Sequence, residues 1–209
     1  MRYSSYPLNA PDAKDGEPNT VIIPEPESYK DVFQLIDSDF YRTRGHHTSA
    51  WSIMLWILRH PLSIEPLFRL AHYKGLFQPL AVFLFNRCKK RRNIYFPETT
   101  KVGFGLYYGH AMCMVINGGT VIGNNVCLSQ FINIGTNHNT PATIGDNAYI
   151  GPMSSIIEDV HIGSNATIGA AAVVVKSVPS NATVVGNPAR VVNYNSPAQF
   201  IANPYPLPK

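Results

Sequence analysis

Large aliphatic residues recur at every sixth position across the second half of the chain, and this period constrains the fold more than any other feature. An α-helix would repeat every three to four residues and a half-buried strand every two. A strict period of six is typical of a parallel β-helix, in which each hexad forms one flat face of a three-sided prism. The residues at this spacing are Val102, Tyr108 and Met114, then Ile122, Leu128 and Ile134, then Ile144, Ile150, Ile156, Ile162, Ile168 and Val174.

The period also indicates how such a prism is stabilised. Each hexad supplies one large side chain that points into a narrow axis, so stacked coils bury a continuous apolar column and no coil is stable alone. Glycine follows several of these anchors, as at Gly145 and Gly163, because the chain must turn a corner there. From Val102 onward we therefore expect a mainly β fold.

The period breaks twice, and repeat folds usually carry their functional sites in such insertions. Met114 and Ile122 are eight residues apart, which predicts a two-residue bulge near residues 117 to 120. The second break predicts four extra residues within 136 to 142. The histidines beside these breaks are His110 and His138.

The first half of the chain follows a different pattern. Apolar residues between Ser28 and Asn86 take a helical spacing, which predicts a small helical domain. We divide the chain into an extended arm over residues 1–27, an α-helical domain over 28–93, a β-helix domain over 94–192 and a tail over 193–209.

The net charge of +4 is mild and partly local, because Arg87, Lys89, Lys90, Arg91 and Arg92 lie together. We interpret this cluster as a solvated segment at the end of a helix and expect no nucleic acid partner. Peripheral contact with an anionic membrane is an alternative that we do not favour. The apolar stretch from residue 76 to 85 is too short to span a bilayer and is predicted to form a buried helix, with an interfacial helix as the alternative.

Cys88, Cys113 and Cys127 are odd in number and have no CxxC spacing. We expect reduced thiols and a cytoplasmic location. The N-terminal residues also lack the charged and then apolar pattern of a signal peptide.

The segment from Val102 to Val192 resembles the left-handed β-helix acyltransferases, and most closely the serine acetyltransferase-like branch found among polysaccharide-modifying enzymes. The runs that carry the resemblance are "VGFGLYYGHAMCMVING", "IGNNVCLSQFINIGTNHNTPATIGDNAYIGP", "IGSNATIGAAAVVVKSVP" and "VVGNPARVV". It implies a left-handed parallel β-helix with an N-terminal α-helical domain. It also implies acetyl-CoA as cosubstrate and a homotrimer with sites between subunits, while a dimer of trimers stays open.

The resemblance implies that His110 is the catalytic base, since it occupies the place of the family histidine in "GLYYGHAMC". Imidazole titrates near neutrality and suits the removal of a hydroxyl proton. Two acids of the serine acetyltransferases are missing: Gly109 stands directly before the histidine, and Ile94 stands where an orienting aspartate belongs. Glu98 is the nearest carboxylate in sequence.

His138 is the rival base, because the sugar acetyltransferase branch uses a histidine in a loop at this place. The second histidine would then contact the acceptor or the thioester. The resemblance also implies a set of residues along the CoA arm and at its phosphates. These are Thr136, Gly151, Pro152 and Ala170, with Lys176 and Arg190 as candidates for the nucleotide phosphates.

The main functional hypothesis is an O-acetyltransferase that acts on a hydroxyl of a sugar, nucleotide-sugar or surface-glycan precursor, because both serine-site acids are absent. The first alternative is serine O-acetyltransferase of cysteine biosynthesis. A non-catalytic β-helix scaffold would leave the basic pair and the two histidines unexplained. A metal site needs three converging histidines, and His161 is expected to face outward because it precedes the anchor Ile162, so we expect none.

Overall fold

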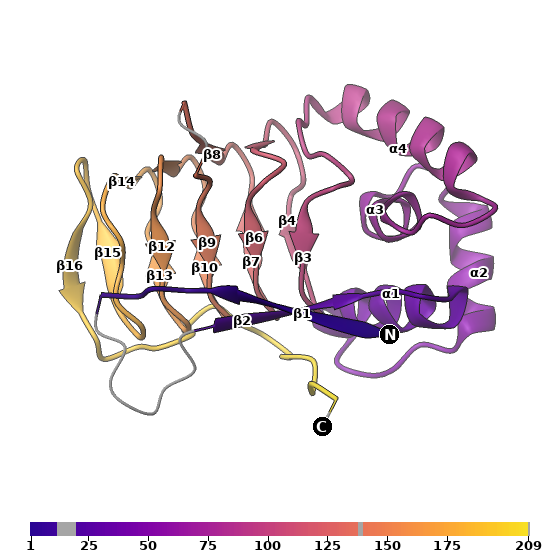
Figure 1. Cartoon of the computed structure of the whole chain (residues 1–209), viewed down its shortest axis with the longest axis horizontal. Coiled ribbons are helices and arrows are strands. Elements are labelled where there is room, and N and C mark those ends of the chain that lie inside the picture. Colours follow the sequence, from indigo (N-terminus) through magenta and orange to yellow (C-terminus); the bar gives the residue numbers. More distant parts are fainter. Residues whose placement is uncertain (12–19, 138–139, 209) are drawn as a thin grey trace.

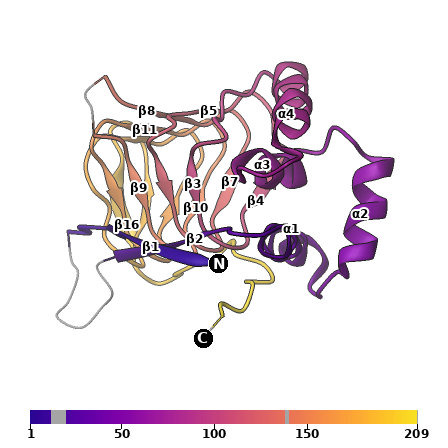
Figure 2. The ribbon, with the colours of Figure 1, turned by 45° about the vertical axis from the view of Figure 1, so that its right-hand side comes forward.

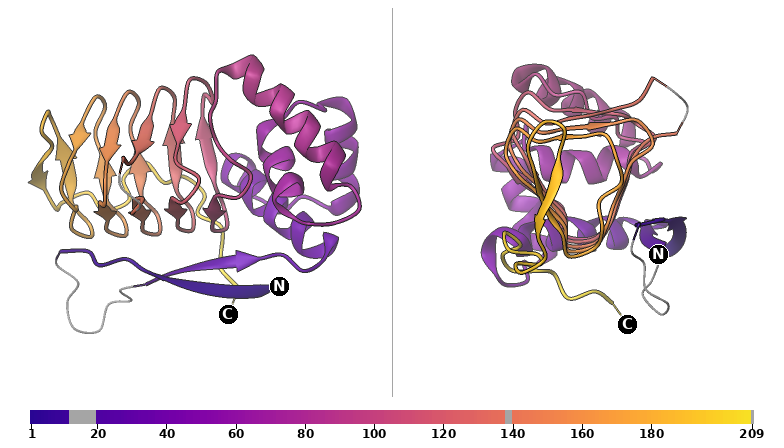
Figure 3. Two further views of the ribbon diagram at one scale, coloured as in Figure 1. Left: turned by 45° about the horizontal axis from the view of Figure 1, so that its top comes forward. Right: turned by 90° about the vertical axis from the view of Figure 1, so that its left-hand side faces the viewer.

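The structure, a computed structural model, describes residues 1–11, 20–137 and 140–208 of the 209-residue chain. A prism of short strands forms one end of the molecule, and the helices α1 to α4 form the other (Figure 1). A view along the prism axis shows three flat walls, with one coil stacked on the next (Figure 3). The predicted fold class, a parallel β-helix preceded by a helical domain, is confirmed.

Each wall is a sheet to which every coil contributes one parallel strand. The first wall contains β3 (Lys101–Val102), β6 (Val121–Ile122), β9 (Thr143–Ile144) and β12 (His161–Ile162). The second wall contains β4 (Tyr107–Gly109), β7 (Cys127–Ser129), β10 (Tyr149–Ile150), β13 (Thr167–Ile168) and β15 (Thr183–Val185), with β16 (Arg190–Asn193) antiparallel at its end. The third wall contains β5 (Val115–Ile116), β8 (Asn133–Gly135), β11 (Ser155–Ile157) and β14 (Val173–Val174).

The residues of the six-residue period stack on one another as predicted, with one exception. Ile150 pairs with Leu128 on one side and with Ile168 on the other, and all three side chains are fully buried. Burying an aliphatic side chain of this size contributes about 1.5–3 kcal/mol. The column of such residues along the axis is therefore the main source of stability of the prism.

The exception corrects the predicted position of the first break. Ile116, and not Met114, pairs with Ile134 in the next coil. Ile116 lies six residues before Ile122, so the turn over residues 117 to 120 is regular and holds no bulge. Met114 and Ile116 are both fully buried, since alternate residues of a strand point to the same side. The spacing alone did not distinguish them.

Asparagines in the left-handed conformation line the corner between the first and second walls. Asn147, Asn165 and Asn181 have φ values of 55°, 60° and 63°. Their side chains form a ladder in which Asn147 donates to Asn165 and Asn165 donates to Asn181, both at 3.0 Å. Asparagine tolerates this conformation better than most residues, which explains its repeated use at the corner.

The helical domain consists of α1 (Tyr29–Arg44), α2 (Ala50–Arg59), α3 (Ile64–His72) and α4 (Gln78–Arg92). Ser28 caps α1 in a reciprocal capping box with Asp31, and Gly45 ends it in the left-handed conformation. Phe68 of α3 stacks on Phe96 with ring centroids 4.6 Å apart. This contact continues the core of the helices into the axis of the prism.

The predicted burial of residues 76 to 85 is only half correct. Phe85 is fully buried, whereas Leu80 and Phe83 are 58% and 57% exposed. One face of α4 packs inward and the other faces solvent. Within the described residues, no helix is long and apolar enough to cross a membrane.

A buried ion pair joins the helices to the first coil. Arg69 of α3 donates from Nε and Nη2 to the two carboxylate oxygens of Asp39 in α1, both at 2.8 Å. The same guanidinium donates to the carbonyl oxygens of Val102 and Gly103, and the backbone N–H of Leu106 donates to Asp39. One pair therefore fixes two helices and the start of the prism relative to one another.

Both ends of the chain lie along the outside of the prism. The strands β1 (Arg2–Pro7) and β2 (Thr20–Glu25) form an antiparallel hairpin, which packs against Val121 of the first wall (Figure 3). The C-terminal tail returns from β16 toward the helices. Tyr205 in this tail forms two backbone hydrogen bonds with the Asn125 side chain and stacks on Phe104.

The Asp39–Arg69 pair leads to a stability prediction. Replacing Arg69 with Met leaves a buried carboxylate without its partner, so we expect a loss of about 3–5 kcal/mol in the free energy of unfolding. Adding Asp39→Leu to Arg69→Met should recover part of this loss, because no buried charge is left. Denaturant unfolding measures both variants, with Lys30→Met on the exposed side of α1 as control. A double variant less stable than the single one would contradict the assignment.

Candidate active site

The corner between the second and third walls holds two extra residues in the first coil. The chain takes eight residues from the anchor Tyr108 to the anchor Ile116, whereas the coils stacked on it take six. Gly109 still pairs with Ser129, so the extra residues begin at His110. Sequence reasoning found the insertion and the histidine but placed the insertion on the next corner.

His110 and Ala111 are the inserted pair. After them the stack resumes, because the Phe131 N–H donates to the Met112 carbonyl oxygen at 3.2 Å. His110 has a φ of 57° and is exposed. A left-handed φ is uncommon for histidine, and here it turns the chain outward at the edge of the prism.

The first coil has no preceding coil, and the end of α4 contacts this corner on the side where that coil would lie. The Cys113 N–H donates to the carbonyl oxygen of Arg92 at 2.8 Å, and Tyr95 bonds in both directions to the strand that follows the corner. The residues that follow the insertion therefore keep backbone partners, although the first coil has no preceding coil.

No carboxylate in the described part of the chain orients His110. Ile94, which stands at the place of the family aspartate, is buried in the core. The Glu98 carboxylate lies 3.4 Å from the Lys89 ammonium instead. His110 itself makes no hydrogen bond or ion pair with any residue that the structure describes. Among the described residues, no other carboxylate takes the place of the two missing family acids.

Three predicted cosubstrate residues lie on the same corner in the later coils. A Cβ at Gly151 would come within 2.5 Å of the Ile168 carbonyl oxygen, so close stacking of the coils requires a glycine there. The Pro152 carbonyl accepts a hydrogen bond from Ala171 at 2.9 Å. Ala170 is exposed, and its N–H has no partner among the described residues.

Thr136 lies at the opposite edge of the third wall, at the foot of the second insertion. Its hydroxyl donates to Glu158 at 2.8 Å, and the Asn137 N–H donates to the other oxygen of the same carboxylate at 3.3 Å. His138, the rival base, lies outside the described residues. Sequence reasoning missed Glu158, and its only signal was its place one coil beyond Thr136.

The two corners are separated by the width of the third wall. About four residues cross this wall, and at about 3.3 Å per residue that is on the order of 13 Å. His110 and Thr136 therefore lie at opposite edges of the third wall within one subunit.

Lys176 and Arg190 come together at the open end of the prism. Both line a pocket of about 280 Å³, along with Ser177, Val178 and Pro179. Both side chains are exposed. The two cations predicted for the nucleotide phosphates therefore share one concave surface, although 14 residues separate them in sequence.

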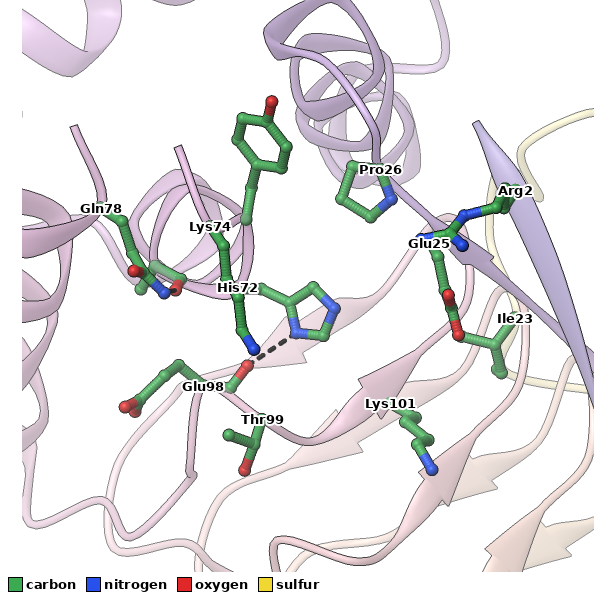
Figure 4. Close-up of a pocket in the computed structure, with 12 residues that line it drawn as sticks. Arg2, Ile23, Glu25, Pro26, His72, Lys74, Gln78, Glu98, Thr99 and Lys101 are labelled. Atoms are coloured by element: carbon green, nitrogen blue, oxygen red, sulfur yellow. Dashed lines mark hydrogen bonds between the residues drawn. The ribbon is translucent and has the colours of Figure 1, made fainter. Parts of the chain in front are cut away.

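A larger pocket of about 470 Å³ lies between the hairpin β1–β2, the end of α3 and the start of the prism, and it contains none of the predicted site residues (Figure 4). His72 points into it and donates from Nδ1 to the Glu98 carbonyl oxygen at 2.7 Å. Burial lowers the pKa of His72 below its usual value, so the ring is neutral at pH 7. Lys74 and Lys101 share the pocket with Glu25 and Glu98, so its charge is mixed.

A family model and several known proteins are similar to this chain. Residues 141–176 match the family described as bacterial transferase hexapeptide (six repeats). Serine acetyltransferase of Haemophilus influenzae is 28% identical over 81% of this chain and 66% of its own length. The chain spans between 30% and 66% of the length of the first curated relatives.

Two solved structures are similar over most of the chain. Serine acetyltransferase of Neisseria gonorrhoeae in complex with serine has a TM-score of 0.63 and 28% identity, covering 78% of this chain and 70% of that one. A serine acetyltransferase in complex with CoA has a TM-score of 0.62 and 28% identity, covering 79% and 72%.

The assignment of His110 and Ala111 as an insertion predicts the effect of removing them. Deleting both restores the six-residue corner, so the melting temperature should change by less than about 5 °C. Deleting Gln130 and Phe131 from the regular corner of the next coil is the matched control. It should lower the melting temperature by on the order of 10 °C or more. Equal damage by both deletions, measured by thermal unfolding, would contradict the register.

Proposed function

We propose that this chain, which belongs to the left-handed β-helix acyltransferases with hexapeptide repeats, transfers an acetyl group from acetyl-CoA to a hydroxyl group. The observation that carries the proposal is the two-residue insertion that presents His110 on the same prism edge as the free N–H of Ala170. The similarity to a serine acetyltransferase in complex with CoA supports the choice of cosubstrate.

The residues at this edge suit the chemistry. An alcohol must lose its proton as it attacks a carbonyl, and the His110 imidazole would accept that proton. A backbone N–H next to the thioester carbonyl would donate to the oxyanion that develops; Ala170 lies three strands further along this edge and would contact the pantetheine arm instead. Acetyl-CoA would supply the activated acetyl group as a thioester. Ala170 leaves room for the thin pantetheine arm, and Lys176 and Arg190 would bind phosphates through charge-assisted hydrogen bonds.

A homotrimer would bring the two corners together. The third wall and its corner expose apolar side chains at Val115, Phe131 and Met153, with exposed fractions of 47%, 49% and 66%. Exposed apolar side chains on one side of the prism favour contact with another copy. In that arrangement the corner at His110 would face the loop after Thr136 of a neighbouring subunit, so that His138 would contact the acceptor or act as the alternative base.

Two acceptors have support from different observations. The comparisons support serine better than the sugar that sequence reasoning favoured, since the similar proteins are serine acetyltransferases and one is in complex with serine. The site itself favours an acceptor that has no charged amino group, such as a sugar. Gly109 and the buried Ile94 supply no carboxylate that could bind the amino group of serine. Serine is therefore the first acceptor to test, and a sugar hydroxyl is the second.

A thiol-release assay with acetyl-CoA tests the function directly. Release of CoA that depends on serine or on a nucleotide-sugar identifies the acceptor. His110→Ala should reduce the rate on the order of 10²- to 10⁴-fold, because the reaction loses its general base. His46→Ala, an exposed histidine of the helical domain, is the matched control and should keep full activity.

Three outcomes would change the assignment. Full activity in His110→Ala together with its loss in His138→Ala would move the base to the second histidine. Full activity in both variants would exclude a histidine as the general base. If neither serine nor a nucleotide-sugar increases the release of CoA, the proposed activity is wrong.

The shared pocket of Lys176 and Arg190 gives a binding prediction. If Arg190 contacts the ribose phosphate of CoA, Arg190→Ala should weaken CoA binding about 10- to 100-fold and weaken dephospho-CoA binding much less. Isothermal titration measures both ligands, with Lys30→Ala as control. Equal weakening of the two ligands would exclude the contact with that phosphate.

A further inference from the structure

One face of α4, together with the turn before it, is apolar along its first half and basic along its second. We call this surface the α4 face. Residues three and four positions apart lie on the same side of a helix, so its members form one stripe. They are Leu76, Phe77, Leu80, Phe83, Arg87, Lys90 and Arg91.

The apolar half is exposed to an unusual degree. Leu76 is 83% exposed and Phe77 is 59% exposed at the turn, and Leu80 and Phe83 continue at 58% and 57%. The opposite side of α4 packs Ala81, Phe85 and Cys88 into the core. The helix is therefore anchored without this face, and burial within the subunit does not explain its large apolar residues.

The basic half is also free of partners within the described chain. Arg87, Lys90 and Arg91 form no ion pair there, and Arg87 lies over the Phe83 ring at 5.9 Å. In contrast, Lys89 pairs with Glu98, and Arg92 donates to the Leu62 carbonyl oxygen. The cations that α4 uses for its own packing are thus distinct from the three that point to solvent.

The charge around the α4 face indicates what covers it. Residues 50–92 contain a single carboxylate, Glu65. They contain eight cationic side chains: Arg59, Arg69, Lys74, Arg87, Lys89, Lys90, Arg91 and Arg92. A second copy of this helical region would bring cations against cations and almost no carboxylate. An anionic lipid surface offers both an apolar layer and negative charge.

We propose that the α4 face docks the protein on an anionic membrane surface. Leu76, Phe77, Leu80 and Phe83 insert at the level of the acyl boundary, while Arg87, Lys90 and Arg91 contact lipid phosphates. These residues share one side of α4 over its whole length, about 22 Å for 15 residues, so α4 would lie in the plane of the interface. Figures 1 and 2 both place α4 on the outside of the helical end, on the side away from the hairpin β1–β2.

This surface lies at the end of the molecule opposite to the pocket of Lys176 and Arg190 (Figure 1). Docking through α4 therefore leaves the open end of the prism and its walls accessible. The inference does not depend on the proposed activity, because membrane binding is measured without acetyl-CoA or an acceptor.

Vesicle flotation tests the proposal with the full chain. We expect binding to vesicles that contain phosphatidylglycerol, little binding to phosphatidylcholine alone, and release as the salt concentration rises. Arg87→Gln/Lys90→Gln/Arg91→Gln should weaken binding on the order of 100-fold, since each cation near an anionic surface is worth about fivefold. Leu80→Ser/Phe83→Ser should weaken it at least as strongly at any salt concentration.

Matched controls separate this docking from general effects. Ile22→Ser removes an exposed apolar side chain of the hairpin, and Lys30→Gln removes an exposed cation of α1; both should bind vesicles as the wild type does. Unchanged circular dichroism in every variant excludes misfolding. Equal binding of the wild type to neutral and anionic vesicles would overturn the proposal. Failure of the wild type to bind vesicles would also overturn it, with a change of oligomeric state in Leu80→Ser/Phe83→Ser as the second result to look for. The second result would assign the face to another copy of the chain.

Discussion

The stacking of one coil on the next is the interaction on which the rest of the structure depends. The strands are only two to four residues long in the prism, and each obtains its hydrogen bonds from the coils on either side. Gly123 and Gly145 each donate to the carbonyl oxygen of an anchor one coil further along, and Gly163 donates in the same way to Val178, at 2.8–2.9 Å. A single wrong register would therefore remove both the hydrogen bonds and the burial of several anchors at once.

The first coil has no coil before it on which to stack. The helical domain packs against it in the place of that coil. Arg69 bonds the carbonyl oxygens of Val102 and Gly103, and the end of α4 accepts the Cys113 N–H. Because these contacts replace a preceding coil, the residues on either side of the corner at His110 keep their backbone partners although the corner holds two extra residues. The helical domain thus both closes the prism and shapes the candidate site.

The sequence predicted the fold from one periodic feature, and the structure confirms the anchors from Ile122 onward. It misplaced the first insertion because Met114 and Ile116 are both buried, and a period of six does not tell which of two alternate inward residues is the anchor. The residues of the candidate site were named from the resemblance, as were the missing acids at Gly109 and Ile94, and their roles stay predictions. Its three-dimensional grouping was not, since Lys176 and Arg190 meet only through the irregular end of the prism. The exposed half of α4 was not predictable either, because apolar residues lie all around that helix.

The account makes one central claim: the corner enlarged by His110 and Ala111 is where the acetyl group is transferred. A crystal structure of the full chain with CoA tests it most directly. The account predicts that the CoA sulfur lies within a few ångström of the His110 imidazole, between two subunits, with the nucleotide toward Lys176 and Arg190. CoA bound instead in the pocket of His72, or along a wall with its sulfur far from the enlarged corner, would contradict it.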